Sequence, residues 1–187
     1  MRLQVVVGAT RPTRAGESIA RWFYEKAEGL GVFEELEWID LAEVELPFFD
    51  EPRHPRLGQY EHEHTKRWSA TVERADAFVF VTPEYNHAPP AALLNAIDFL
   101  SKEWAYKPLG ILSYGGTSAG TRSAQILKQV AVALKMMPIP ETVAIPYFTQ
   151  HMKEGTFVPG PDQENAVEPM LRELHRWAKA LESLRRG

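Results

Sequence analysis

The chain of 187 residues contains no cysteine, which excludes disulfides and thiolate chemistry. This absence suits a reducing compartment, so we expect a cytoplasmic protein. A strong charge of one sign is also missing: 21 Lys and Arg residues against 25 Asp and Glu give a net charge of −4. Nucleic acid is therefore not expected as a partner. No apolar run reaches the roughly 18 residues of a membrane span, and the N-terminus has no signal-peptide pattern, so no membrane association is expected.

Hydrophobic residues make up 44% of the chain, and we expect one folded domain over residues 1–187. Apolar runs alternate with apolar stripes at helical spacing. The expected strands cover residues 3–7, 35–41, 75–83, 107–116 and 141–146, and the expected helical stripes lie within 19–30, 65–75, 93–100, 127–137 and 167–181. Five such repeats predict an α/β fold whose parallel sheet is covered on both faces. Ligands of such sheets bind beyond the carboxyl ends of the strands.

The first loop at such an end, residues 8–18, joins an apolar strand to a helical stripe. Backbone amides and the dipole at a helix N-terminus attract anions. The loop adds hydroxyl and guanidinium donors that suit phosphate, from Thr10, Arg11, Arg14 and Ser18. The alternative is a solvated surface loop whose arginines pair with Glu17 or Asp40. The loop alone does not decide between the two.

Two common phosphate motifs do not fit this loop. A nucleoside-triphosphate loop ends in Gly-Lys followed by Ser or Thr, and the chain contains no such tripeptide. A dinucleotide fingerprint reads G-x-G-x-x-G, but no second glycine follows Gly8 before Gly16. Its ribose-binding acid lies about 20 residues further on, whereas Asp40 lies 32 positions after Gly8. The phosphate of a mononucleotide remains.

Two more loops leave strand ends with unusual residues. The segment PEYN begins at Pro83 and offers an aromatic face, an amide and rigid backbone donors. The segment SYGGTSAG, residues 113–120, contains a glycine pair that lets backbone approach a flat ligand. Ordinary turn chemistry is the alternative, because Pro, Asn and Gly are common in turns. All three loops are expected at one edge of the sheet, which favours a shared ligand.

Together these loops resemble the NADPH-dependent FMN reductase family, which has a flavodoxin-like fold and includes quinone, azo-dye and chromate reductases. The resemblance rests on GATRPTRAG, IDLAEVELPFFD, PEYN leading into LLNAIDFLS, and SYGGTSAG, which occur in the family's order over most of residues 1–146. It implies a three-layer sandwich around a five-stranded parallel sheet of order 2-1-3-4-5. It also implies bound FMN, with NADPH or NADH as co-substrate; the sequence does not choose between these two.

The resemblance also implies where FMN binds. Around the phosphate it implies Thr10, Arg11, Arg14, Gly16, Glu17 and Ser18. Along the isoalloxazine ring it implies Pro83, Glu84, Tyr85 and Asn86, and at the far edge of the ring Ser113, Tyr114, Gly115 and Gly116. Ala9 departs from the family, in which many members have serine there. Replacing Arg14 with alanine is expected to weaken FMN more than riboflavin, which lacks the phosphate.

Three histidines and two serines invite other interpretations. His62 and His64 are two positions apart, which on a helix places them on different sides, so we predict no metal site there with His54. Ser118 and Ser123 lie in no G-x-S-x-G nucleophile elbow. No catalytic side chain is predicted, because a flavin itself carries the redox chemistry.

The implied activity is electron transfer from NAD(P)H through FMN to small-molecule acceptors such as quinones, free flavin or azo compounds. One ring face that serves donor and acceptor in turn predicts ping-pong kinetics. The alternatives are a flavodoxin-type electron carrier, which would be more acidic than −4, and a binding protein that has lost its flavin.

A homodimer or homotetramer is expected from two apolar segments. Residues 43–60 are long for an α/β connection and place Leu46, Phe48 and Phe49 beside prolines. The expected helix 91–104 has apolar residues on more than one side: Leu93, Leu94, Phe99 and Trp104. Burial of both segments would require a partner surface, and the resemblance implies dimers formed beside the PEYN segment. The alternative is that the C-terminal helix or residues 147–163 cover these side chains within one chain.

Overall fold

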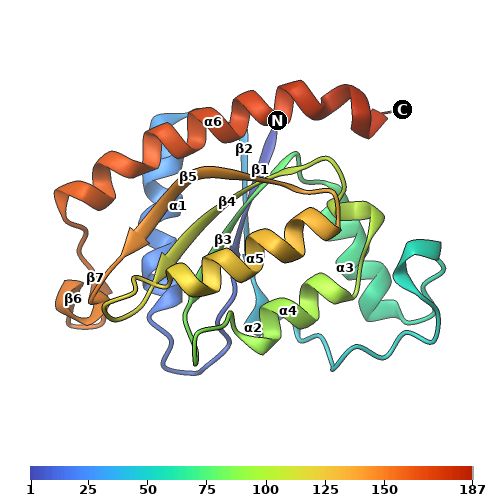
Figure 1. Cartoon of the computed structure of the whole chain (residues 1–187), viewed down its shortest axis with the longest axis horizontal. Helices are drawn as coiled ribbons and strands as arrows, with labels where there is room; N and C mark the ends of the chain where they lie inside the picture. Colours follow the sequence, from blue (N-terminus) through green and yellow to red (C-terminus); the bar gives the residue numbers. More distant parts are fainter. Residues whose placement is uncertain (187) are drawn as a thin grey trace.

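The computed structural model describes residues 1–186, with side chains as far as Arg185. Its central sheet has the order β2-β1-β3-β4-β5 with every pair parallel, as expected for a flavodoxin-like fold (Figure 1). The strands are β1 (Arg2–Val7), β2 (Glu35–Asp40), β3 (Ala77–Pro83), β4 (Pro108–Tyr114) and β5 (Met137–Ile145). The helices are α1 (Gly16–Leu30), α2 (Leu41–Val44), α3 (Glu63–Glu73), α4 (Ala91–Asp98), α5 (Thr121–Ala133) and α6 (Pro161–Arg186).

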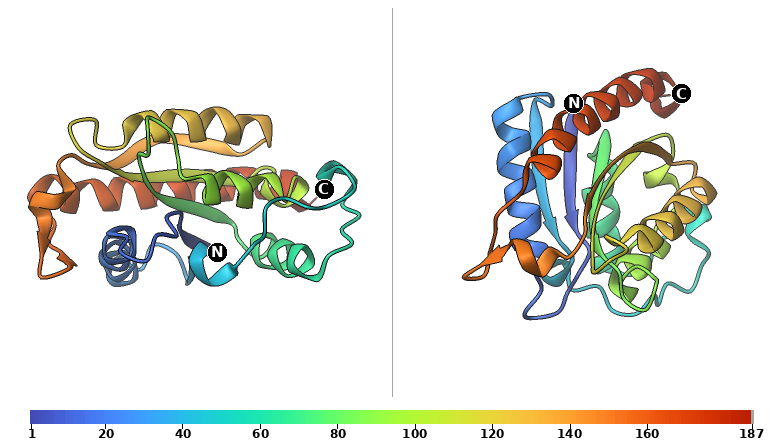
Figure 2. Two further views of the ribbon diagram at one scale, coloured as in Figure 1. Left: turned by 90° about the horizontal axis from the view of Figure 1, so that it is seen from below. Right: turned by 60° about the vertical axis from the view of Figure 1, so that its left-hand side comes forward.

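Helices cover both faces of the sheet (Figures 1 and 2). Successive residues of a strand point to opposite faces, so Val5 packs with α1 and α6 while its neighbour Val6 packs with α3, α4 and α5. In the same way Val79 faces one side and Phe78 the other. Because both faces of β1, β3 and β4 are buried, these three strands read as continuous apolar runs rather than as alternating ones. This is why the sequence located them well.

The boundary between α5 and β5 differs from the expectation. The predicted helical stripe ran to Met137, but α5 ends at Ala133 and Met137 is the first residue of β5. Pro138 and Pro140 concealed this strand, because proline lacks the amide that a sheet ladder requires. β5 lies at the edge of the sheet, where a missing donor on the open side costs nothing.

The prediction of one apolar helix over residues 91–104 is also wrong. α4 ends at Asp98, and a separate 3-10 turn, η2 (Lys102–Trp104), follows it. Leu93, Phe99 and Trp104 are buried within the same chain, so this segment needs no partner to cover it. The connection 43–60 holds the end of α2 and a second short turn, η1 (Pro55–Leu57).

The segment between β5 and α6 folds into elements that the sequence did not indicate. It contains η3 (Phe148–His151) and a small antiparallel hairpin of β6 (Met152–Lys153) and β7 (Thr156–Phe157). The hairpin lies beside α1, because the Phe157 amide donates to Ser18 Oγ at 2.8 Å and the Phe157 ring contacts Trp22. No helix in the described part of the chain is long and apolar enough to cross a membrane.

Candidate functional site

The three loops predicted to hold a ligand follow β1, β3 and β4, which are neighbours in the sheet. Parallel pairing brings their carboxyl ends together: Val7 lies opposite Val81, and Pro83 opposite Tyr114. The loop after β1 is anchored by the Gly8 amide, which donates to Val81 O at 2.9 Å. A Cβ on Gly8 would lie 2.9 Å from a Leu93 methyl group. Glycine is therefore required for this close approach.

Arg14 is held in place by acidic side chains. Its Nη2 lies 2.6 Å from Asp40 Oδ2 at the end of β2 and 3.2 Å from a Glu17 oxygen. Asp40 is 2% exposed at its side chain, and Arg14 13%. The alternative interpretation of this loop, in which its arginines pair with Glu17 or Asp40, is therefore confirmed for Arg14. One donor stays unused: Arg14 Nε is buried and has no hydrogen-bond partner among the described residues.

Arg11 has different surroundings. It is exposed, and no carboxylate pairs with it in the described part of the chain. Its guanidinium lies 6.0 Å from the ring centroid of Tyr85, in the loop after β3. Arg11 therefore links the first two loops and keeps its donors available, whereas Arg14 uses most of its own.

Helix α1 begins without a capping side chain. Its N-cap is Ala15, and no side-chain hydrogen bond caps the first turn. The amides of a first helical turn have no partner within the helix, so Glu17 and Ser18 present theirs at the loop. The Gly16 backbone instead hydrogen bonds the hydroxyl of the buried Tyr114. A Cβ on Gly16 would lie 2.5 Å from that hydroxyl oxygen, so the first and third loops are in close contact here.

The PEYN segment forms a tight turn. The Tyr85 amide donates to Ala88 O at 2.9 Å, and the Ala88 amide donates back to Tyr85 O at 3.0 Å. Asn86 and His87 between them both have positive φ, 51° and 68°, and both are exposed. Their amides donate to no backbone carbonyl in the described chain. The turn thus presents two backbone donors outward.

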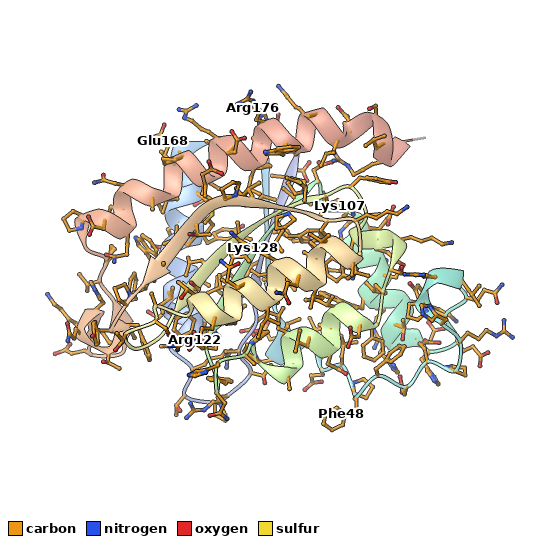
Figure 3. All side chains as sticks on the ribbon, viewed as in Figure 1. Phe48, Lys107, Arg122, Lys128, Glu168 and Arg176 are labelled. Atoms are coloured by element: carbon orange, nitrogen blue, oxygen red, sulfur yellow. The ribbon has the colours of Figure 1, made fainter. Side chains whose placement is uncertain are left out.

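Glu84 fixes the base of that turn. Arg122 at the start of α5 (labelled in Figure 3) donates to Glu84 from its guanidinium at 2.7 Å and from its amide at 3.1 Å. Burial alone would raise the pKa of Glu84, but hydrogen bonds from Arg122 and Ser118 outweigh it and hold the pKa below its usual range. Glu84 is therefore ionised, and its carboxylate holds the turn against the start of α5. Sequence reasoning missed Arg122 because nothing in the local pattern connects it with residue 84.

The adjacent glycines of the third loop, Gly115 and Gly116, have different surroundings. A Cβ on Gly115 would lie 2.9 Å from the backbone nitrogen of Gly120, so Gly115 is required for the loop to close on itself. A Cβ on Gly116 would meet no atom within 4 Å. Its carbonyl accepts from the Tyr147 amide at 3.0 Å, which places Tyr147 next to the loop. Only Gly116 has the open space expected beside a flat ligand.

The structure places His62 and His64 differently from the sequence-based prediction. His62 is the N-cap of α3 rather than part of the helix, so helical spacing does not separate it from His64. The two rings stack with centroids 5.2 Å apart, and His64 Nε2 lies 3.0 Å from Asp50 Oδ1. Among the described residues no group of three or more His, Cys, Asp and Glu side chains could hold a metal ion. The predicted separation of His62 and His64 was wrong.

Comparison with known proteins identifies the family. The model of the NADPH-dependent FMN reductases matches residues 1–150. The chain belongs to this family. An NAD(P)H-dependent FMN reductase of Schizosaccharomyces pombe is 36% identical over 184 residues, which cover 97% of this chain and 91% of the relative. An NADPH azoreductase of Bacillus is 26% identical over 188 residues, covering 100% of this chain and 97% of the relative.

Solved structures support the same fold. The NAD(P)H:(acceptor) oxidoreductase FerB of Paracoccus denitrificans superposes with a TM-score of 0.73 at 21% identity, covering 96% of this chain and 97% of FerB. As an NADPH-dependent FMN reductase, the chain is an oxidoreductase that uses NAD(P)H and FMN. Family membership thus decides against the electron carrier and against a protein that has lost its flavin.

The residues present fit FMN. Arg14 Nε is a buried donor without a partner among the described residues, the α1 N-terminus is uncapped, and the space beside Gly116 is open. Ser18 lies at that N-terminus, but its oxygen already accepts from Phe157. Pro83 and Ser113 are buried strand residues and contribute backbone. The assignment of individual residues to FMN stays a prediction.

Proposed function

We propose that this NADPH-dependent FMN reductase passes electrons from NAD(P)H to quinones, free flavin, azo compounds or similar acceptors by a ping-pong mechanism. One observation carries the proposal: the loops after β1, β3 and β4 meet at the same edge of the sheet, where the turn at Asn86 is exposed and a Cβ on Gly116 would meet no atom within 4 Å. FMN bound there would supply the redox chemistry, accepting a hydride and passing the electrons on. The proposal is that this FMN would have one open face, at which donor and acceptor bind in turn.

Each loop has a separate task in this proposal. Arg11 and the first-turn amides of α1 bind the phosphate, because they combine a free guanidinium with an uncapped helix N-terminus. Arg14 fixes the loop through Asp40 and directs its remaining donor at the ligand. The outward amides of Asn86 and His87 face the polar edge of the ring, where they stabilise negative charge.

Steady-state kinetics test the proposal. With NAD(P)H and a quinone varied at saturating FMN, double-reciprocal lines are expected to be parallel, because the first product leaves before the acceptor binds. Lines that intersect would show a ternary complex and contradict a shared face.

We further propose that the protein forms a homodimer, or a tetramer built from it. Phe48 on the 43–60 connection is 88% exposed and points away from the body of the protein (Figure 3). Its neighbour Phe49 is partly exposed, and its ring meets Phe99 edge-on. Exposed aromatic side chains at adjacent positions commonly mark an interface, and a second copy of the same patch is the simplest cover.

A further inference from the structure

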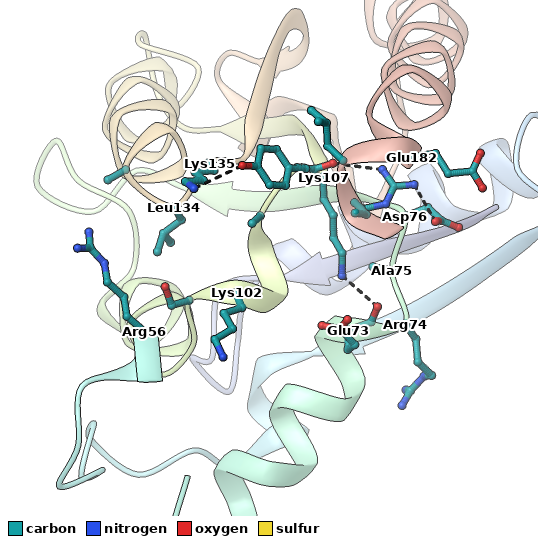
Figure 4. A pocket seen from close by; sticks show the side chains of 16 residues that line it. Arg56, Glu73, Arg74, Ala75, Asp76, Lys102, Lys107, Leu134, Lys135 and Glu182 are labelled. Carbon is teal, nitrogen blue, oxygen red and sulfur yellow. Dashed lines mark hydrogen bonds and ion pairs between the residues drawn. The ribbon is translucent and has the colours of Figure 1, made fainter. Parts of the chain in front are cut away.

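A cavity lies at the opposite edge of the sheet from the three loops. Its volume is about 770 Å³, within the range of small-molecule sites. It opens where β3, β4 and β5 begin: Asp76, Lys107 and Lys135 precede these strands by one or two residues. Figure 4 shows the cavity between the end of α3, the end of α5 and the last turn of α6.

The walls of this cavity are basic. They carry six Lys and Arg side chains, namely Arg56, Arg74, Lys102, Lys107, Lys135 and Arg185, against three acids, Glu73, Asp76 and Glu182. The whole protein has a net charge of −4. Arg74 is ion-paired with Glu37, which does not line the cavity, and Arg185 is ion-paired with Asp76. The local positive charge therefore comes from the other four cations. A concave surface concentrates their field, which attracts anions.

The floor of the cavity holds two cations rigidly. Lys107 is only 4% exposed, and its ammonium donates to the carbonyls of Val72 and Glu73 at the end of α3, at 2.9 and 3.0 Å. Arg185 donates to Tyr106 O at 3.1 Å and to Asp76 Oδ1 at 3.0 Å. No acid lies within hydrogen-bond distance of the Lys107 ammonium among the described residues, so the floor of the cavity is positive where this group is protonated.

The rim of the cavity holds cations with free donors. Arg56 of η1 and Lys102 of η2 are exposed, and no acid pairs with either side chain among the described residues. Lys135 donates only to the Tyr106 hydroxyl, at 3.4 Å. Tyr106 and Lys135 both adopt positive φ, 61° each, and the Tyr106 amide donates to Lys135 O at 2.8 Å. This left-handed pair directs both side chains to the cavity.

We propose that this cavity binds a small organic anion that carries two or more phosphate groups, at a site separate from the flavin. Guanidinium and ammonium groups on several elements can donate to several phosphate oxygens at once. A ligand with a single carboxylate would leave most of these donors unused. Leu134 and the Tyr106 ring provide an apolar wall for the organic part. The size of the cavity favours a small ligand.

Titration calorimetry on the FMN-loaded protein tests the site with two probes, inorganic pyrophosphate and ADP, at constant ionic strength. Saturable binding with one ligand per chain is expected for both. The variant Arg56→Ala/Lys102→Ala removes both free rim cations and is expected to weaken each probe about 10- to 100-fold. The control Arg172→Ala/Arg176→Ala removes equal charge from the exposed face of α6 and is expected to change binding less than about twofold.

Three results would overturn the proposal: no saturable binding, equal weakening by the two double variants, or competition between the probes and NAD(P)H at the flavin. Tighter binding of ADP than of pyrophosphate supports a nucleotide as the ligand, and equal binding supports the phosphates alone. Arg56 and Lys102 lie outside the three loops, so FMN content and NAD(P)H oxidation are expected to stay unchanged in the variant. This test is independent of the proposed ping-pong reaction.

Discussion

Arg11 and Arg14 lie three residues apart in the same loop, yet their surroundings differ. Arg14 pairs with the buried Asp40 and with Glu17, whereas Arg11 has no acidic partner among the described residues. The sequence could not show which arginine pairs with an acid, because Asp40 lies on a different strand and comes beside the loop only in the folded chain. The alternative interpretation is therefore confirmed for Arg14, whereas phosphate binding by Arg11 stays a prediction.

Replacing Arg11 with alanine is expected to weaken FMN binding about 10- to 100-fold while leaving riboflavin binding unchanged, because only FMN has the phosphate. Replacing Arg14 with alanine has a different expected result. It leaves the buried Asp40 unpaired, so the free energy of unfolding should fall by about 2–3 kcal/mol. Fluorescence titration of both flavins and denaturant unfolding measure the two effects. Equal losses of FMN and riboflavin in Arg11→Ala would remove Arg11 from the phosphate.

At the scale of elements, helix α3 ends on a buried ammonium. Lys107, just before β4, donates to its last carbonyls, which suits the negative end of the helix dipole. Burial lowers the pKa of Lys107 to about 8, below the value of about 10.4 in an unfolded chain. Between these two values the unfolded chain binds more protons than the folded chain, so stability should rise with pH.

Thermal or denaturant unfolding between about pH 8 and 9.5 measures this rise. The upper limit avoids the half-buried Tyr60 and the buried Tyr114. Burial raises the pKa values of both, and their ionisation on unfolding would lower stability at higher pH. The variant Lys107→Met should lose most of the rise. If the wild-type protein and the variant show the same slope, Lys107 is not the group responsible.

Elements were predictable where local pattern and tertiary context agreed. β1, β3 and β4 are buried on both faces, so their apolar runs were clear in the sequence. β5 was shortened because its prolines are tolerated only at the sheet edge, and a strand's place in the sheet is not visible locally. The sequence did not indicate the β6–β7 hairpin, because each of its strands has only two residues and contacts with α1 hold it in place.

At the scale of the whole molecule, the 43–60 connection provides the best support for a dimer. The apolar helix that was also expected to require a partner is buried within its own chain, so that part of the argument fails. Phe48 remains, exposed and without cover. The sequence indicated apolar residues in both segments but could not show which ones the chain covers itself.

The variant Phe48→Asp is therefore expected to shift the protein from dimer to monomer in sedimentation equilibrium at micromolar concentration. The matched control is Leu184→Asp, which places an acid on another exposed apolar side chain at the end of α6. It should leave the mass unchanged. A wild-type monomer with FMN bound, or a Phe48→Asp variant that stays dimeric, would remove this patch from the interface.

The central claim is that one open flavin face receives electrons from NAD(P)H and then gives them to the acceptor. Its most direct test is the isolated first half-reaction: NAD(P)H added without oxygen or acceptor to the FMN-loaded protein, with the visible flavin absorbance recorded. We expect the absorbance to be lost, and a quinone added after removal of NAD(P)⁺ to restore it. Loss of absorbance only when the quinone is already present would contradict the shared face.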